Sequence, residues 1–182
     1  MMFTTKILDG LDGLATGIVA IGAMMIYFLT ETARFYQPNV GLLALIFAGA
    51  CLGFLIFNFY PAKIFLGEGG GLFVGYILGI LAVIAGGKVA TALLVMAVPI
   101  LDLFRVSYLR LKRGKSIFQG DRSHLHFQLL DLIGHRKAVL LLYLISALFG
   151  LTTLFLQSTG KLIVLLFLLV AMMVVGWRLG RD

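Results

Sequence analysis

Residues 40–57, VGLLALIFAGACLGFLIF, form an apolar run without a charged side chain. The hydrocarbon core of a bilayer is about 30 Å thick, and a helix of about 20 apolar residues crosses it. The whole chain is 61% hydrophobic with a mean hydropathy of +1.07, whereas a soluble domain is about half apolar. These values exclude a soluble globule and predict a membrane protein.

Further apolar runs lie on both sides of this segment. Helix is the expected state for all of them, because unpaired backbone polar groups are too costly in lipid. We therefore predict an all-α polytopic transmembrane helix bundle that forms a single membrane domain over residues 1–182. The six predicted spans are Leu11–Leu29, Val40–Phe57, Leu72–Ala85, Val89–Val106, Ala138–Leu156 and Leu162–Trp177.

The basic residues are distributed unevenly between the two sides of this bundle. Six spans place both termini on one side, and that side carries twelve of the fifteen Lys and Arg residues. Because cytoplasmic loops are enriched in Lys and Arg, both termini are predicted to be cytoplasmic. The net charge of +7 then reflects membrane topology, and we expect no nucleic-acid partner.

Two carboxylates precede the first predicted span, in Asp9-Gly10-Leu11-Asp12-Gly13. Residues three apart at a helix start share one face. Paired carboxylates can hold a divalent metal, act as a general base or accept hydrogen bonds from a sugar or nucleobase. Helix capping is the simpler explanation for a lone Asp, but two carboxylates alternating with glycines favour a site.

A third carboxylate, Glu68, lies in residues 58–71, NFYPAKIFLGEGGG, between two apolar runs. A glycine-rich loop beside a helix start exposes backbone N–H groups that can hold a phosphate. A carboxylate there suits a magnesium ion that bridges protein and phosphate oxygens. A flexible turn is the alternative, but Asn58, Pro61 and Phe65 add a pattern that favours a site.

The segment Ser107–Lys137 is the longest one that is not apolar. We predict a basic cytoplasmic loop with a short surface helix, capped by Asp121 or Ser123. His124 and His126 would point to different faces of that helix, which argues against joint metal chelation. One of them could donate to a phosphate while the other fixes the loop; interfacial histidine is the alternative.

Two further features accompany this loop. Arg122 and Arg136 provide basic surroundings that favour an anionic ligand. Asp102 and Arg105 form an i,i+3 pair near the end of the fourth span, which we interpret as structural. Ionisable groups at membrane depth are nevertheless candidates for function.

The predicted topology brings these groups to one face of the membrane. Asp9, Asp12, Glu68, His124 and His126 all fall on the cytoplasmic side. We therefore predict one site at the inner leaflet for an anionic ligand that carries phosphate.

Three segments together resemble one enzyme family. They are KILDGLDGLATG (residues 6–17), GFLIFNFYPAKIFLGEGGGLFVG (53–75) and PILDLFRVSYLRLKRGKSIFQGDRSHLHFQLLDL (99–132). In this order they resemble the motifs of the polyprenyl-phosphate N-acetylhexosamine-1-phosphate transferases, which include phospho-N-acetylmuramoyl-pentapeptide transferase. The resemblance implies transfer of N-acetylhexosamine-1-phosphate from a UDP-sugar to undecaprenyl phosphate, with release of UMP. It implies Mg²⁺ as cofactor, with Mn²⁺ as a substitute, and a role in cell-wall or surface polysaccharide synthesis at the plasma membrane.

The resemblance also implies roles for individual residues. Asp9 and Asp12 would lie at the metal and nucleotide site, and Glu68 would stand where the family has a metal-binding Asp. Phe65 would lie against the uracil, while His124 and His126 would face the diphosphate. The residues assigned to substrate binding are Lys6, Gly10, Leu11, Asn58, Phe65 and Arg122.

Several positions depart from the family pattern. Lys6 stands where the family usually has Asn, Gly71 replaces Ser, and Phe127 stands where His is common. Because Lys6 and Glu68 depart together, we expect them to approach each other. The ammonium would then offset charge near the metal while the longer Glu reaches it.

The family also carries an Asp-Asp motif in an earlier cytoplasmic loop and has more spans. We therefore expect the sequence to be the C-terminal part of such an enzyme and not to catalyse alone. The alternatives are a transporter or scaffold with an ion site in a broken helix, or an inactive remnant that binds lipid phosphate. The sequence leaves the oligomeric state open, a homodimer being one option.

Overall fold

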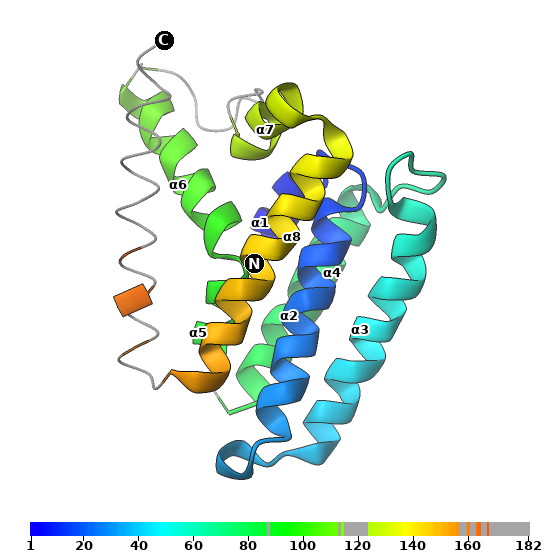
Figure 1. The fold of residues 1–182 in the computed structure, drawn as a ribbon, viewed down its shortest axis with the longest axis vertical. Coiled ribbons are helices and arrows are strands. Elements are labelled where there is room, and N and C mark those ends of the chain that lie inside the picture. The colour runs from blue at the N-terminus through cyan, green and yellow to red at the C-terminus, as the bar shows by residue number, and fades with distance from the viewer. Residues whose placement is uncertain are drawn as a thin grey trace.

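The computed structural model of the chain describes residues 1–86, 88–112, 114, 124–156, 160, 163, 164 and 167. Every regular element in these ranges is a helix, which confirms the all-α prediction (Figure 1). The elements are α1 (Met2–Leu8), α2 (Leu14–Thr30), the 3₁₀ turn η1 (Ala33–Phe35), α3 (Pro38–Asn58), α4 (Gly67–Ile84), α5 (Val89–Val95), α6 (Ala97–Lys112), α7 (Leu125–Ile133) and α8 (His135–Phe155).

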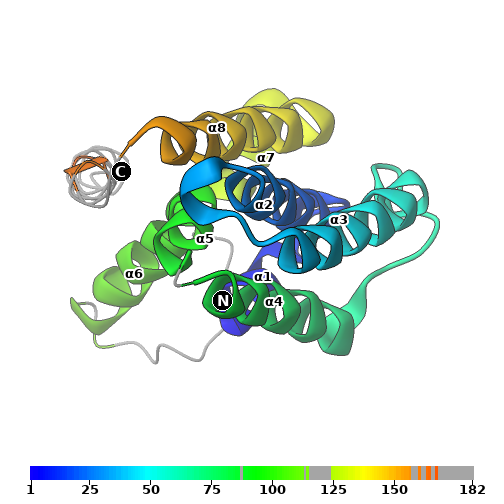
Figure 2. The ribbon, with the colours of Figure 1, turned by 90° about the horizontal axis from the view of Figure 1, so that it is seen from below.

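Helix α2 lies at the centre of the bundle. It contacts α3, α4, α5 and α8, as the view along the bundle shows (Figure 2). Its sequence is apolar around the whole circumference, which is the pattern of a helix buried on all sides. Leu14, Ile18 and Ile26 are accordingly inaccessible to solvent.

Two glycines allow neighbouring helices to approach closely. A Cβ on Gly17 of α2 would lie 2.1 Å from the ring of Tyr143 on α8. A Cβ on Gly75 of α4 would lie 2.2 Å from Thr5 Oγ1 on α1. Small residues permit such contacts in membrane bundles, so these positions determine how α8 packs on α2 and how α1 packs on α4.

The described residues contain three or four candidate spans, and the prediction was six for the whole chain. Among the described helices, α3, α4 and α8 are each long and apolar enough to cross a membrane, and α5 with α6 makes a fourth span if this bent pair is counted as one. Helix α2 is apolar but has 17 residues, and at 1.5 Å per residue it falls slightly short of a hydrocarbon core about 30 Å thick. The predicted span Leu162–Trp177 lies almost entirely outside the described residues.

The predicted span Val89–Val106 is broken. Helices α5 and α6 meet at an angle of 72°, and Met96 separates them. Pro99 explains the break, because it has no N–H to donate to the carbonyl of Val95 four residues earlier. Proline is tolerated in the first turn of the new helix, where N–H groups have no intrahelical partner.

The predicted basic loop is shorter than Ser107–Lys137. Helix α6 continues to Lys112 and α8 already begins at His135. The predicted surface helix is present as α7, but its N-cap is His124. The expected caps Asp121 and Ser123 lie outside the described residues.

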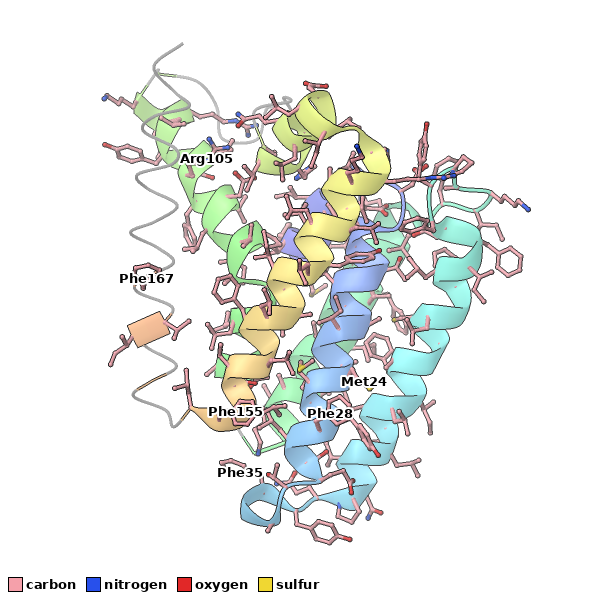
Figure 3. The ribbon with its side chains drawn as sticks, in the orientation of Figure 1. Met24, Phe28, Phe35, Arg105, Phe155 and Phe167 are labelled. Atoms are coloured by element: carbon pink, nitrogen blue, oxygen red, sulfur yellow. The ribbon has the colours of Figure 1, made fainter. Side chains whose placement is uncertain are left out.

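The two ends of the bundle differ in character. Helix α7, the start of α8 and the α3–α4 connection lie at one end, and the α2–α3 connection lies at the other (Figure 1). Figure 3 places Arg105 towards the α7 end and Phe28, Phe35 and Phe155 towards the opposite end. The polar motifs singled out from the sequence therefore share one end of the bundle.

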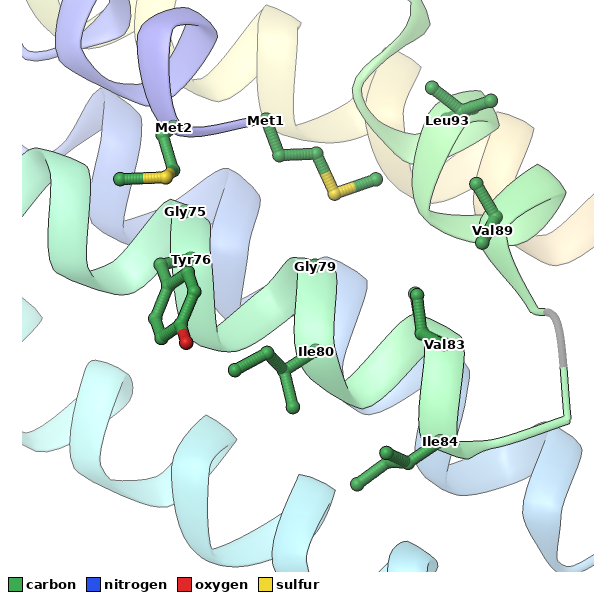
Figure 4. A pocket seen from close by; sticks show the side chains of 11 residues that line it. Met1, Met2, Gly75, Tyr76, Gly79, Ile80, Val83, Ile84, Val89 and Leu93 are labelled. Carbon is green, nitrogen blue, oxygen red and sulfur yellow. The ribbon is translucent and has the colours of Figure 1, made fainter.

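An apolar cavity of about 600 Å³ opens between α1, α4 and α5 (Figure 4). Met1, Met2, Tyr76, Val83 and Leu93 are among its lining residues. None of the residues predicted to form the site contributes to it. The cavity therefore offers room for apolar groups and no carboxylate or imidazole chemistry.

The contact between Gly17 and Tyr143 leads to a stability prediction. We expect Gly17→Ala to destabilise the protein by about 1–3 kcal/mol, the usual cost of overpacking, because the new methyl group would overlap the Tyr143 ring. Thermal unfolding in detergent, followed by circular dichroism, measures this change. Gly49→Ala on α3 is the matched control, because nothing lies within 4 Å of a Cβ there. Equal melting temperatures for the two variants would contradict the close packing of α2 on α8.

Candidate functional site at one end of the bundle

The turn between α1 and α2 carries the first two carboxylates. Asp9 is the C-cap of α1, and Gly13 is the N-cap of α2 with a φ of 80°, which favours glycine. Asp9 and Asp12 therefore lie in a turn, and the prediction that they share a helix face is wrong. Leu11 is buried in the core, where it anchors the turn, while Gly10 is exposed.

Asp9 faces the start of α4. Its carboxylate accepts a hydrogen bond from the backbone N–H of Gly67. Burial raises the pKa of Asp9 above its ordinary value, the nearby Asp12 carboxylate raises it further, and the bond from Gly67 opposes both effects. The first turn of a helix has free N–H groups and a positive dipole end, so Asp9 lies where an anionic ligand is also favoured.

Asp12 connects the turn to two other segments. The Ala62 N–H donates to Asp12 Oδ2 at 3.1 Å, and His135 Nε2 lies 3.3 Å from the Asp12 carbonyl oxygen. The His135 ring stacks on Tyr60, with centroids 4.2 Å apart. The α3–α4 connection and the start of α8 are thus fastened to the Asp12 region.

Asn58 and Phe65, both predicted to bind substrate, differ in their surroundings. Asn58 is buried, where its Oδ1 accepts from Thr16 Oγ1 at 3.0 Å and its Nδ2 donates to the Ile64 carbonyl at 3.0 Å. Asn58 therefore holds the α3–α4 connection in shape. Phe65 is 72% exposed, so its ring is free to meet a ligand.

Glu68 lies in the first turn of α4 and not in a loop. The glycine run that follows it is helical, which corrects the predicted phosphate loop. Gly71 packs against the backbone of Lys6, and the Gly71 carbonyl accepts from Thr5 Oγ1 at 2.7 Å. The glycines at this position thus bring α1 onto α4.

Lys6 and Glu68 form a salt bridge. The expectation that these two departures from the family pattern approach each other is therefore confirmed. Their side chains are 42% and 69% exposed, and exposed ion pairs contribute little to stability. A contribution to ligand binding is the more informative hypothesis for this pair.

Asp102 is the residue whose role the sequence did not reveal. This carboxylate of α6 is 3% exposed. Its Oδ1 accepts from Arg105 Nε at 3.0 Å and from Nη2 at 2.8 Å, and its Oδ2 lies 2.9 Å from both His124 Nδ1 and the Leu125 N–H. The pair with Arg105 was predicted, but the contacts to the histidine motif required the tertiary structure.

The histidine motif meets the first carboxylate turn. A Cβ on Gly10 would lie 2.8 Å from the Phe127 ring and 3.3 Å from His126 Nε2. The rings of His124 and His126 are nearly parallel, with centroids 5.5 Å apart. Residues more than a hundred positions apart in the chain are therefore in contact.

His126 is buried and uncharged. Burial lowers the pKa of its imidazole to about 4, and the neighbouring His124 contributes in the same direction. Its Nε2 has no hydrogen-bond partner within the part of the chain that the structure describes. A buried polar atom without a partner is costly, so this nitrogen is available to a ligand.

The predicted site residues are thus largely brought together. Asp9 and the Lys6–Glu68 pair lie at the start of α4. Asp12 is bonded to the α3–α4 connection, and Gly10 lies beside His126 of α7. Arg122 lies outside the described residues. The described residues contain no group of three His, Cys, Asp or Glu side chains arranged to hold a metal. The carboxylates of the Asp9–Asp12 turn still fit magnesium, which is usually held by one or two carboxylates together with water and substrate phosphates.

Part of the chain matches a known protein family. The model of glycosyl transferase family 4 matches residues 2–86, which include the carboxylate turn, Asn58 and Glu68. Residues 2–86, slightly less than half of the chain, are therefore similar to glycosyl transferase family 4. This finding confirms the family resemblance inferred from the motifs.

Individual relatives extend the match beyond these residues. A probable undecaprenyl-phosphate N-acetylglucosaminyl 1-phosphate transferase of Bacillus subtilis is 32% identical over 94% of this chain and 50% of its own length. A decaprenyl-phosphate N-acetylglucosaminephosphotransferase of Mycobacterium leprae is 39% identical over 75% of this chain and 40% of its own length. A phospho-N-acetylmuramoyl-pentapeptide-transferase of Thermodesulfovibrio yellowstonii is 39% identical over 66% of this chain and 38% of its own length. The chain thus spans at most half the length of these relatives.

The lowered pKa of His126 predicts a pH dependence of stability. The unfolded chain binds a proton at about pH 6.5, whereas the folded chain excludes it down to about pH 4. The free energy of unfolding should therefore fall as the pH drops through this window. The two pKa values differ by about 2.5, which corresponds to roughly 3 kcal/mol.

His126→Gln isolates this contribution. Asp9 acts in the opposite direction, because its raised pKa stabilises the folded state in acid, and the effect of Asp9 is present in both proteins. Denaturant unfolding between neutral pH and about pH 4 should show a smaller loss of stability in the variant than in the wild type. Parallel pH profiles would rule out a buried neutral imidazole at position 126.

Proposed function

We propose that this chain forms the diphosphate-binding part of a phosphotransferase of the polyprenyl-phosphate N-acetylhexosamine-1-phosphate class. The substrates would be a UDP-N-acetylhexosamine and undecaprenyl phosphate, and UMP would be released. The names of the relatives supply the polyprenyl phosphate and the N-acetylglucosamine phosphate, and the UDP donor and the UMP product follow from the motif resemblance. The site would face the cytoplasm at the plasma membrane, in agreement with the bias of Lys and Arg.

The observation that carries the proposal is the contact of Gly10 with His126 and Phe127. It brings carboxylates and imidazoles from distant parts of the chain to one end of the bundle. Phosphoryl transfer depends mainly on positioning and on neutralising charge. A site that combines metal-binding carboxylates, a helix N-terminus and imidazole nitrogens has the chemistry for that task.

Each group has a definite task in this proposal. A magnesium ion held by Asp9 and Asp12, with Glu68 nearby, would neutralise phosphate charge. The first turn of α4 would direct its N–H groups at a phosphate oxygen, Phe65 would stack on the uracil, and His126 would contact the diphosphate. Asn58 would keep the α3–α4 connection in the shape that presents Phe65.

The transporter alternative predicted polar ligands at a helix break. The break lies at Met96, flanked by Val95 and Ala97, and all three residues are buried and apolar. No polar side chain is therefore present at the break itself. The polar groups gather at the end of the bundle, which favours the phosphotransferase.

Nucleotide binding tests the proposal. The purified chain in lipid nanodiscs should bind UDP-N-acetylglucosamine with Mg²⁺ and lose this binding in EDTA. Release of UMP on addition of undecaprenyl phosphate is the corresponding activity assay. Binding without UMP release would agree with a C-terminal part that does not catalyse alone, whereas absence of nucleotide binding in both conditions would refute the proposed site and favour the remnant that binds lipid phosphate only.

Asp9→Asn should weaken the Mg²⁺-dependent binding by about 10- to 100-fold, the range expected when a metal site loses an important partner. The substitution removes a charge but keeps the side-chain size. Isothermal titration with UDP-N-acetylglucosamine measures the change. Glu31→Gln, at the opposite end of α2, is the matched control and should bind like the wild type. Equal affinities of the Asp9 and Glu31 variants would remove Asp9 from the site.

The Lys6–Glu68 pair should matter for magnesium more than for stability. Because exposed ion pairs contribute about 0.2–1 kcal/mol, Glu68→Gln should leave the melting temperature nearly unchanged. It should raise the Mg²⁺ concentration needed for half-maximal nucleotide binding, since it removes a carboxylate near the metal. A large loss of stability with an unaltered Mg²⁺ requirement would assign the pair a structural role instead.

A further inference from the structure

Asp102 connects two parts of the structure that the sequence separates. It belongs to α6, and it is bonded to the residues that begin α7. We propose that Asp102 is a positioning residue that fixes the tautomer of His124 and the start of α7, and so holds the histidine motif against the Asp9–Gly13 turn. The identity of the ligand that the histidine motif would contact rests on the proposed function. The tautomer of His124 does not depend on that function.

The hydrogen bonds of Asp102 leave little freedom to His124. An ionised carboxylate only accepts hydrogen bonds, and each oxygen of Asp102 already faces donors. Oδ1 accepts from Arg105, and Oδ2 accepts from the Leu125 N–H at 2.9 Å. His124 Nδ1, 2.9 Å from Oδ2, must therefore carry a proton. The other ring nitrogen, Nε2, is the one left to face outward from this contact.

Asp102 also replaces a missing helix cap. The N-cap of α7 is His124, and its side chain makes no capping hydrogen bond within α7. The Leu125 N–H at the start of α7 is satisfied by Asp102 from a different helix. A negative group near a helix N-terminus also interacts favourably with the helix dipole. The carboxylate thus fixes where α7 begins.

Arg105 keeps this carboxylate in place. The side chains of Asp102 and Arg105 are 4% and 9% exposed, and a buried charge needs a partner and full hydrogen bonding. The guanidinium supplies two donors to Oδ1, so Oδ2 is directed at the histidine motif. Because Asp102 and Arg105 are three residues apart on α6, this helix alone brings their side chains together.

The start of α7 in turn places His126. The His126 ring lies nearly parallel to that of His124 and tilted against Phe127, with centroids 4.3 Å apart. Its buried Nε2 lies beside Gly10. A substitution of Asp102 would therefore shift the start of α7 and with it the position of His126 beside the carboxylate turn. This effect requires no direct contact between Asp102 and the turn.

Nitrogen-15 NMR of histidine-labelled protein in nanodiscs tests the tautomer. The chain contains three histidines, so His→Gln variants assign each signal, and the two neutral tautomers give different nitrogen shifts. At a pH above the ordinary histidine pKa of about 6.5, wild-type His124 should carry its proton on Nδ1, either alone or together with one on Nε2. A wild-type His124 with a bare Nδ1 would overturn the proposal, whether or not any variant folds.

Asp102→Asn gives the second measurement. Arg105 requires an acceptor, so the Asn carbonyl should turn towards Arg105 and its NH₂ group towards His124. The His124 proton should then move to Nε2. Asp131→Asn removes an exposed carboxylate of α7 and should leave all three histidine spectra unchanged. A spectrum of Asp102→Asn identical to that of the wild type would overturn the proposal.

Nucleotide affinity then separates a positioning role from a general loss of structure. If Asp102 acts through His124, then Asp102→Asn, His124→Gln and the double variant should weaken UDP-N-acetylglucosamine binding by the same factor. Additive losses in the double variant would contradict action through His124. A wild type that binds no nucleotide would refute the proposed function, and the tautomer measurement would still decide the role of Asp102.

Discussion

The contact between the Asp9–Gly13 turn and the start of α7 is the constraint on which the candidate site depends. Gly10 has no side chain, so the Phe127 ring and His126 Nε2 can approach its backbone closely. Without this contact the carboxylates would belong to one corner of the bundle and the imidazoles to another. The glycine thus joins the two kinds of chemistry that a diphosphate requires.

Burial of α2 supplies the frame for this contact. Because α2 packs against α1, α3, α4, α5 and α8, the turn at its N-terminus cannot move independently of them. Tyr143 of α8 donates to the Gly13 carbonyl at 2.6 Å, and Asp12 is bonded to the α3–α4 connection. The carboxylate turn is therefore held by segments from most of the chain, which is the preorganisation that electrostatic stabilisation requires.

The sequence predicted those features that follow from local composition. Apolar runs identified α2, α3, α4 and α8, and the pattern around Asp9, Glu68 and His124 identified one end of the bundle. The break at Met96 was missed, although Pro99 provided the signal. The sequence could not reveal that Asp102 caps α7, because that contact depends on how α6 approaches a distant helix. The role of Asn58 could not be predicted from the sequence either. Its amide is hydrogen-bonded to Thr16 and to the Ile64 carbonyl, and these contacts depend on the tertiary structure.

By the motif resemblance, Phe127 stands at a position where a histidine is expected. The Phe127 ring packs against Gly10, and unlike an imidazole it has no proton to exchange at this position. An anion bound here would therefore contact two different imidazoles. His124 is hydrogen-bonded to Asp102, and His126 is buried and neutral. Two imidazoles provide fewer groups for proton transfer than a motif of three histidines would. The Phe127 ring also leaves less room for water to compete with the ligand.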